Sequence, residues 1–156
     1  MISIPNKKDG AQIHAINAKN TVFNQEEVKC VDELWDEYLA QGPEQSGYNF
    51  LVEKEDERVL GYACYGPRSL TSGTFDLYWI AVDPTIHRGG TGRKLLSASE
   101  EAIRKLGGRL IVLETSGLPT YEPTRKFYLA TGYTLEATLR DFYSEGDDVV
   151  IFTKHL

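Results

Sequence analysis

The segment from Thr74 to Gly107 contains the residue types best suited to binding an anionic ligand. Three glycines stand within four positions, and three basic side chains flank them: Gly89, Gly90, Gly92, Arg88, Arg93 and Lys94. Glycines leave backbone N–H groups unobstructed, and the start of a helix carries partial positive charge. Because a helix-periodic stretch follows, the pattern predicts a phosphate-binding turn at a helix N-terminus. The plain alternative is an ordinary glycine-rich connection whose basic side chains face solvent.

Two nucleotide-binding motifs can be tested against this turn. The P-loop ends in Gly-Lys-Ser/Thr, but here Lys94 follows an arginine and precedes Leu95. The dinucleotide fingerprint fits better, because glycines precede a helix and Glu114 ends the next strand, near the place of a ribose-binding acid. However, Leu95 replaces its third glycine, and residues 83–88 separate the turn from the preceding strand. We therefore exclude the P-loop and discount the dinucleotide motif.

The hydrophobic pattern predicts the elements that position this turn. A strand over residues 74–82, rich in aromatic and β-branched residues, should end at Pro84, because proline cannot donate to a ladder. After the turn, apolar residues at helical spacing predict a helix that ends at Gly107. The apolar run over residues 109–115 then predicts a strand buried on both faces.

Further elements are expected on both sides of this segment. The pattern predicts a short edge strand at 1–5, helices at 10–18 and from Asn24 to Gly42, and a strand hairpin at 49–54 and 58–67. After residue 115, a helix from Pro123 to Ala130 should lead to two closing strands, 133–140 and 148–154, joined by a polar loop. This order predicts one mixed α/β domain, residues 1–156, whose sheet carries helices on both faces.

The composition limits the classes of function. At 156 residues and 41% hydrophobic content the chain can build one core, and a net charge of −6 argues against a nucleic-acid partner. Cys30 and Cys64 are too few and too far apart for a zinc site, so we expect no metal and two thiols in the core. Nothing resembles a secretory leader or a membrane span, which favours a cytoplasmic protein without a membrane partner.

Three segments of the chain can be compared with a known family. They are Ile-Ala-Val-Asp-Pro at 80–84, His-Arg-Gly-Gly-Thr-Gly at 87–92, and Arg-Lys-Phe-Tyr-Leu-Ala-Thr-Gly-Tyr at 125–133. With the order of elements between them, they resemble the GNAT superfamily of acyl-CoA-dependent N-acyltransferases over roughly residues 52–154. His87 stands where the family turn has glutamine or arginine, while both later glycines match. The resemblance implies a mixed, mostly antiparallel central sheet with helices on both faces.

The resemblance implies acetyl-CoA, or another acyl-CoA, as the donor. In the family, backbone amides of the turn hold the pyrophosphate, and the end of the central strand hydrogen-bonds the pantetheine arm. These roles map onto Arg88, Gly89, Gly90, Thr91, Gly92 and Arg93 for the pyrophosphate, and onto Ile80, Ala81 and Val82 for the arm. The mapping is physically coherent, because a strand edge can pair with an amide-bearing chain and a helix start can receive a diphosphate.

The resemblance also implies catalytic residues. Tyr128 matches the family tyrosine that protonates the leaving thiolate, a role that suits a phenol with a pKa of about 10. Glu114 matches the base of some members, including ribosomal-protein N-terminal acetyltransferases, and Asp76 matches the glutamate of the histone-acetylating branch. We prefer Glu114, because the polar turn at 115–117 can hold a bridging water. Plain packing for Tyr128 and salt bridges for the carboxylates are the alternatives. Tyr121 replaces an asparagine of many relatives, which puts one CoA contact in question.

The reaction expected from this resemblance is direct acetyl transfer in a ternary complex, without a metal or an acyl-enzyme. The acceptor would be a small-molecule amine or a peptide amine, and the negative net charge mildly favours a cationic one. The segment 141–148 could contribute acidic and aromatic contacts to it, or could be a plain solvated loop. A non-catalytic acyl-CoA-binding regulatory module is the alternative function. The closing strands would offer a homodimer an edge to pair.

Overall fold

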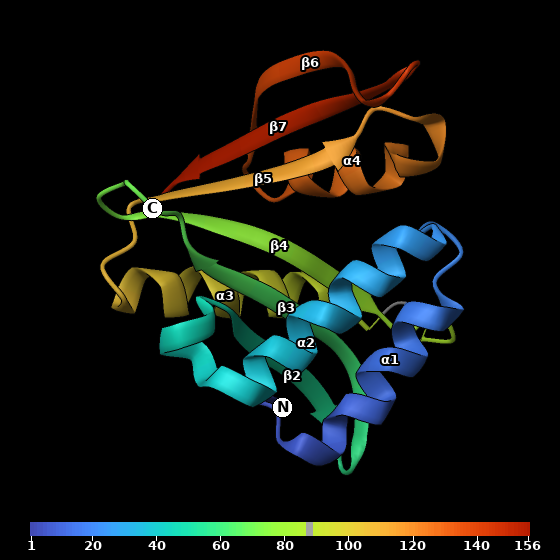
Figure 1. The fold of residues 1–156 in the computed structure, drawn as a ribbon, viewed down its shortest axis with the longest axis vertical. Helices are drawn as coiled ribbons and strands as arrows, with labels where there is room; N and C mark the ends of the chain where they lie inside the picture. Colours follow the sequence, from blue (N-terminus) through green and yellow to red (C-terminus); the bar gives the residue numbers. More distant parts are fainter. Residues whose placement is uncertain (87–88) are drawn as a thin grey trace.

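The computed structural model describes residues 1–86 and 89–156, and Figure 1 shows its fold. The strands are β1 (Ile2–Ser3), β2 (Asn49–Glu55), β3 (Arg58–Pro67), β4 (Thr74–Val82), β5 (Leu110–Ser116), β6 (Thr134–Ser144) and β7 (Asp147–His155). The helices are α1 (Gly10–Lys19), α2 (Gln25–Ser46), α3 (Thr91–Lys105) and α4 (Glu122–Ala130), with short 3-10 turns η1 (Lys7–Asp9) and η2 (Pro119–Tyr121). Each helix and strand predicted from the sequence pattern is present, in the predicted order.

The strands form one seven-stranded sheet in the order β1-β2-β3-β4-β5-β7-β6. Neighbouring strands are antiparallel except β4 and β5, which run parallel. This confirms the expected mixed, mostly antiparallel sheet. β4 and β5 pair only through residues 74–76 and 110–112. Beyond these residues the two strands diverge (Figure 1), and no described strand lies between their carboxyl-terminal halves.

Helices cover both faces of the sheet (Figure 1), as predicted. α1 and α2 pack on one face, over a cluster that contains Trp35, Phe50 and Tyr62. α3 and α4 pack on the other face, over a cluster that contains Leu95 and Phe152. Within the described residues, no helix is both long enough and apolar enough to cross a bilayer. Because helices pack on both faces, the end of the sheet where β4 and β5 diverge lies between two helical layers.

Two details of α2 differ from expectation. Cys64 lies in the core, but Cys30 is exposed, so the prediction that both thiols are buried is wrong for Cys30. Its neighbour Val31 is buried, and successive helical residues point about 100° apart, which turns Cys30 outward. The backbone leaves helical geometry at Gly42 (φ 75°, ψ 172°), as predicted, but helix then resumes and continues to Ser46.

The loop predicted between the closing strands is mostly strand. β6 continues to Ser144, and a tight turn at residues 145–146 leads directly into β7. The Asp141 carboxylate accepts from the Gly146 N–H at 2.8 Å, and the Asp148 carboxylate accepts from the Asp141 N–H at 3.0 Å. These side-chain bonds replace ladder bonds across an irregular part of the hairpin, so a polar segment is held as extended chain.

Candidate active site

α3 begins directly after the glycine-rich turn. Gly90 is its N-cap residue and has φ 65°, a left-handed conformation that favours glycine. No side chain of the described residues caps this helix start, and its first turn contains no acidic residue. The first N–H groups of a helix lack intrahelical partners, so this start offers hydrogen-bond donors and partial positive charge. His87 and Arg88, which belong to the predicted turn, lie outside the described residues.

A pocket of about 340 Å³ lies at this helix start. It is lined by the end of β4, the turn, the first residues of α3 and one side chain of α4: Val82, Ile86, Gly89, Gly90, Thr91, Gly92, Arg93 and Phe127. Its volume is in the range of small-ligand pockets, roughly 300–1,000 Å³. The structure thus brings together the predicted Val82 and the described part of the turn. Sequence reasoning missed Phe127, because only the packing of α4 against the turn reveals its place.

β4 has a free edge next to this pocket. Residues 80–82 pair with β3 on one side, whereas no described strand pairs with them on the side of β5. The register shifts opposite Cys64 and Tyr65, which makes Tyr78 an extra residue in a β-bulge. A bulge increases the local twist of a strand, which is consistent with the divergence from β5. The free edge carries backbone groups that can pair with an amide-bearing chain.

The two predicted carboxylates meet at one arginine. Arg68 donates to Asp76 from Nε, at 3.0 and 3.1 Å, and from Nη2, at 2.8 Å. The same Nη2 lies 3.9 Å from Oε1 of Glu114. The Asp76 side chain is 13% exposed, whereas that of Glu114 is 41% exposed. Asp76 therefore forms a bidentate ion pair with Arg68, while Glu114 stays open to solvent. Nothing in the sequence pattern marked Arg68.

Tyr128 lies on the inner side of α4 and is 7% exposed. Its ring packs against Phe127, Tyr133 and Phe152, with centroid distances of 5.3, 5.5 and 6.0 Å. Burial raises the pKa of its phenol above the usual value. The phenol therefore keeps its proton at neutral pH, as a proton donor must. The packing contact with Phe127, which was the alternative interpretation of Tyr128, is present.

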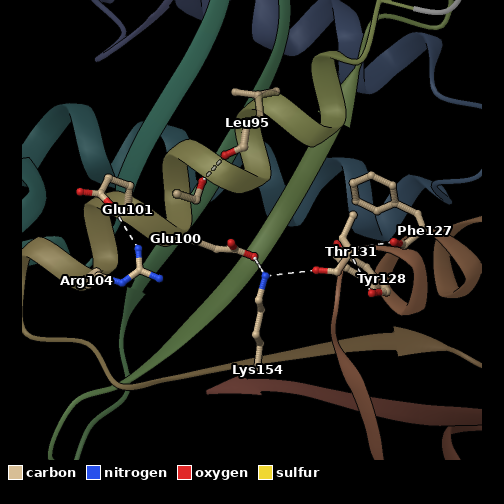
Figure 2. Close-up of polar contacts among 9 residues, drawn as sticks. Leu95, Glu100, Glu101, Arg104, Phe127, Tyr128, Thr131 and Lys154 are labelled. Atoms are coloured by element: carbon tan, nitrogen blue, oxygen red, sulfur yellow. Dashed lines mark hydrogen bonds and ion pairs between the residues drawn. The ribbon is translucent and has the colours of Figure 1, made fainter. Parts of the chain in front are cut away.

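Hydrogen bonds and an ion pair connect the end of α4 to α3 and β7 (Figure 2). The Thr131 hydroxyl donates to the carbonyl oxygens of Phe127, at 2.9 Å, and Tyr128, at 3.0 Å. The Lys154 ammonium donates to the Thr131 carbonyl at 3.1 Å and pairs with Glu100 at 2.9 Å. A cation is favourable at a helix C-terminus. These contacts connect the helix that carries Tyr128 to the helix whose start lines the pocket.

Aromatic and acidic side chains gather beyond the end of β5. The Tyr121 hydroxyl donates to the Glu27 carboxylate, 2.6 Å from Oε1 and 2.8 Å from Oε2. Tyr121 is thus engaged with the start of α2. Burial, followed by the charges of Glu114 and two further carboxylates, raises the pKa of Tyr143 to about 12. In the described part of the chain, no three His, Cys, Asp or Glu side chains could together hold a metal ion.

The sequence matches the Acetyltransferase (GNAT) family over residues 13–133. The chain therefore belongs to the GNAT family of acetyltransferases, which confirms the resemblance seen in its motifs. A solved structure of a GNAT-family protein from Desulfovibrio desulfuricans is 40% identical to this chain, with a TM-score of 0.93 and 99% of each chain covered. No protein with a curated description matches the sequence.

Two more distant structures share the fold. YncA from Salmonella typhimurium, solved with acetyl-CoA, is 22% identical, with a TM-score of 0.78 over 100% of this chain and 93% of its own. The ribosomal-protein-S18-alanine N-acetyltransferase from Escherichia coli is 19% identical, with a TM-score of 0.77 over 99% of this chain and 92% of its own. At such identities the likeness shows the fold alone.

Proposed function

We propose that this acetyltransferase moves the acetyl group of acetyl-CoA directly to a primary amine in a ternary complex. The observation that carries the proposal is the start of α3, which no described side chain caps and which lines a pocket of about 340 Å³ beside the free edge of β4. A diphosphate suits the helix start, and an amide-bearing arm suits the strand edge. Acetyl-CoA carries both groups in one chain and supplies an activated thioester.

Arg93 is the cation proposed to meet the diphosphate. It lines the pocket, whereas the ammonium of its neighbour Lys94 is paired with Glu53 at 2.9 Å. The backbone N–H groups of the first turn of α3 would bind the phosphate oxygens. The pantetheine arm would follow residues 80–82, which places the thioester toward the region where β4 and β5 diverge.

The proposed reaction needs two proton transfers. The amine nitrogen attacks the thioester carbonyl, a C–N bond forms and the C–S bond breaks. The amine loses one proton, and the departing thiolate gains one. A backbone N–H of β4 near Ile80 would donate to the oxyanion that forms on the carbonyl oxygen. Because the amine attacks the thioester itself, no acyl-enzyme is formed.

We assign the base to Glu114 and the acid to Tyr128. Glu114 is 41% exposed, so its carboxylate can accept a proton directly or through one water. Asp76 is less suited, because Arg68 engages both of its oxygens and protonation would break that pair. Tyr128 holds its proton at neutral pH, since burial raises the pKa of its phenol.

The acceptor is proposed to be a small-molecule amine or a peptide amine. Glu27 and Tyr121 form one side of the region beyond β5, and Tyr143 lies near Glu114. Carboxylates around the region beyond β5 raise the local concentration of ammonium groups. Aromatic rings beside them can contact the cation or its carbon chain. This region therefore suits a positively charged amine better than a neutral one.

A thermal-shift comparison of acetyl-CoA, CoA, NAD and ATP at equal concentrations tests the donor. A ligand at 100 times its Kd stabilises the fold by about 2.7 kcal/mol, which is readily detected. We expect a response to acetyl-CoA and CoA alone, followed by CoA release with at least one member of an amine panel. Binding without transfer to any amine would favour a regulatory acyl-CoA-binding module. A preference for NAD, or no response, would overturn the donor assignment.

A further inference from the structure

A buried carboxylate lies beneath the first turn of α3. Glu53 is in β2, on the face of the sheet that α3 covers, and it is 4% exposed. A carboxylate this deep is unfavourable unless partners compensate for its lost hydration. Hydrophobic packing does not explain a carboxylate here, because Leu51, two residues earlier on the same face of β2, belongs to the apolar cluster under α3. The partners of Glu53 therefore indicate its role.

Those partners are both in the first turn of α3. The Lys94 ammonium donates to Glu53 Oε1 at 2.9 Å. Burial alone would raise the pKa of Glu53, but hydrogen bonding with Lys94 and Thr91, together with the positive charges of Lys94 and the chain N-terminus, lowers it. Glu53 is therefore ionised at neutral pH. Its other oxygen, Oε2, is buried without a close partner among the described residues, so the carboxylate depends on this one turn.

Gly61 gives independent evidence that the sheet is shaped to receive this turn. Gly61 pairs with Glu53 on one side and with Val82 on the other. A Cβ at this position would lie 2.7 Å from the carbonyl oxygen of Ala81 and 3.1 Å from Cγ2 of Thr91. A side chain at this position would clash with the backbone of β4 and crowd the helix start. The close approach and the ion pair of the buried Glu53 carboxylate with the exposed Lys94 thus occur at the same point of the sheet.

We infer that Glu53 is a positioning residue for donor binding, which holds the first turn of α3 on the sheet through its ion pair with Lys94. The inference rests on the proposed donor site. Among the described residues no side chain caps α3, and the first N–H groups of a helix lack intrahelical partners, so an external contact stabilises this turn. Lys94 neutralises Glu53, so the anchor does not repel the diphosphate. The pairing of Lys94 with Glu53 also explains why Arg93 lines the pocket and Lys94 does not.

The test is the Kd for CoA, measured by titration calorimetry on the double variant Glu53→Gln/Lys94→Met. Both substitutions are needed, because Glu53→Gln alone frees an ammonium that can move to the diphosphate. The matched control is Glu101→Gln/Arg104→Met, which removes an exposed ion pair of 2.9 Å on the same helix (Figure 2). The Kd should rise about tenfold in the first variant and stay within about twofold in the control.

Hydrogen exchange separates positioning from general stability. Amides at residues 91–94 should exchange faster in the double variant, while those of β5 keep their protection. If the double variant does not fold, hydrogen exchange is compared on Glu53→Gln without CoA, where the freed ammonium has no diphosphate to bind. An unchanged Kd, or equally faster exchange throughout the sheet, would overturn the inference. If the wild-type protein itself does not bind CoA, the proposed donor site is wrong and the inference fails with it.

Discussion

At the scale of single residues, Arg68 distinguishes the two carboxylates that could act as the base. Both lie at the divergence of β4 and β5, and both are within reach of its guanidinium. Asp76 receives short hydrogen bonds on both oxygens, whereas Glu114 is 3.9 Å away and half open to solvent. A base must be free to accept a proton, so the ion pair makes Asp76 the weaker candidate.

Glu114→Gln should lower kcat by about 100-fold, because the variant cannot accept the amine proton. Its pH–rate profile should also lose the rising limb, since that limb reports deprotonation of the base. Asp76→Asn is the comparison, and it should keep the limb while losing stability through the Arg68 pair. A rising limb that persists in Glu114→Gln would move the assignment to Asp76 or to water.

Tyr128→Phe should lower kcat by about 100-fold and leave the Kd for acetyl-CoA within about twofold, because only the proton donor is lost. In the wild-type protein, deprotonation of Tyr128 should not lower the rate below about pH 10. Burial raises the pKa of this phenol, so its acid form persists to higher pH than in a free tyrosine. Equal losses of kcat and affinity in the variant would argue for a packing role only.

At the scale of elements, Lys154 connects three of them. It lies in β7, pairs with Glu100 of α3, and donates to the carbonyl of Thr131 at the end of α4. Its side chain is 27% exposed and that of Glu100 is 13% exposed, so the pair is largely withdrawn from water. Removal of one partner leaves the other buried and uncompensated, which is the costly case for ion pairs.

Lys154→Met should reduce the free energy of unfolding by about 3 kcal/mol, measured by urea denaturation. The double variant Glu100→Gln/Lys154→Met should recover most of this loss, because no buried charge remains. Arg104→Met removes an exposed partner of Glu101 on α3, and it should change stability by less than about 0.5 kcal/mol. If Lys154→Met and Arg104→Met change the free energy of unfolding equally, the contacts of Lys154 contribute no more to stability than a surface ion pair.

At the scale of the whole molecule, buried tyrosines determine the response to alkaline pH. Burial raises the pKa of Tyr62, Tyr128 and Tyr133 in the folded protein. In the unfolded chain each titrates near the usual value of about 10. The folded state therefore binds these protons more tightly. Their contribution to stability is complete below about pH 10 and is lost as the pH rises above it.

We therefore expect the buried tyrosines to ionise only as the protein unfolds. Absorbance at 295 nm should rise in two steps, and the second step should coincide with the loss of the far-ultraviolet circular dichroism signal. The first step belongs to the more exposed members of the nine tyrosines in the chain. Full ionisation of all tyrosines with the dichroism intact would contradict the burial seen in the structure.

Local patterns in the sequence were sufficient for the order of elements and for the glycine-rich turn. Alternation, helical spacing and turn residues act over a few positions, so they can be read without knowledge of the fold. The prediction at residues 140–147 was wrong for the same reason. Their polar character indicated a loop, but hydrogen bonds from Asp141 and Asp148 hold the segment in a hairpin.

The sequence by itself determined that a glycine-rich turn and a helix start follow the central strand, and its motifs resembled those of one family. Only the tertiary structure decided that Arg68 pairs with Asp76, that Lys154 joins α3 to α4, and that Glu53 lies under the first turn of α3. Such pairs form between residues far apart in the chain, as between Tyr121 and Glu27, which are 94 positions apart. Their distances depend on sheet order and helix packing, which no short stretch of sequence encodes.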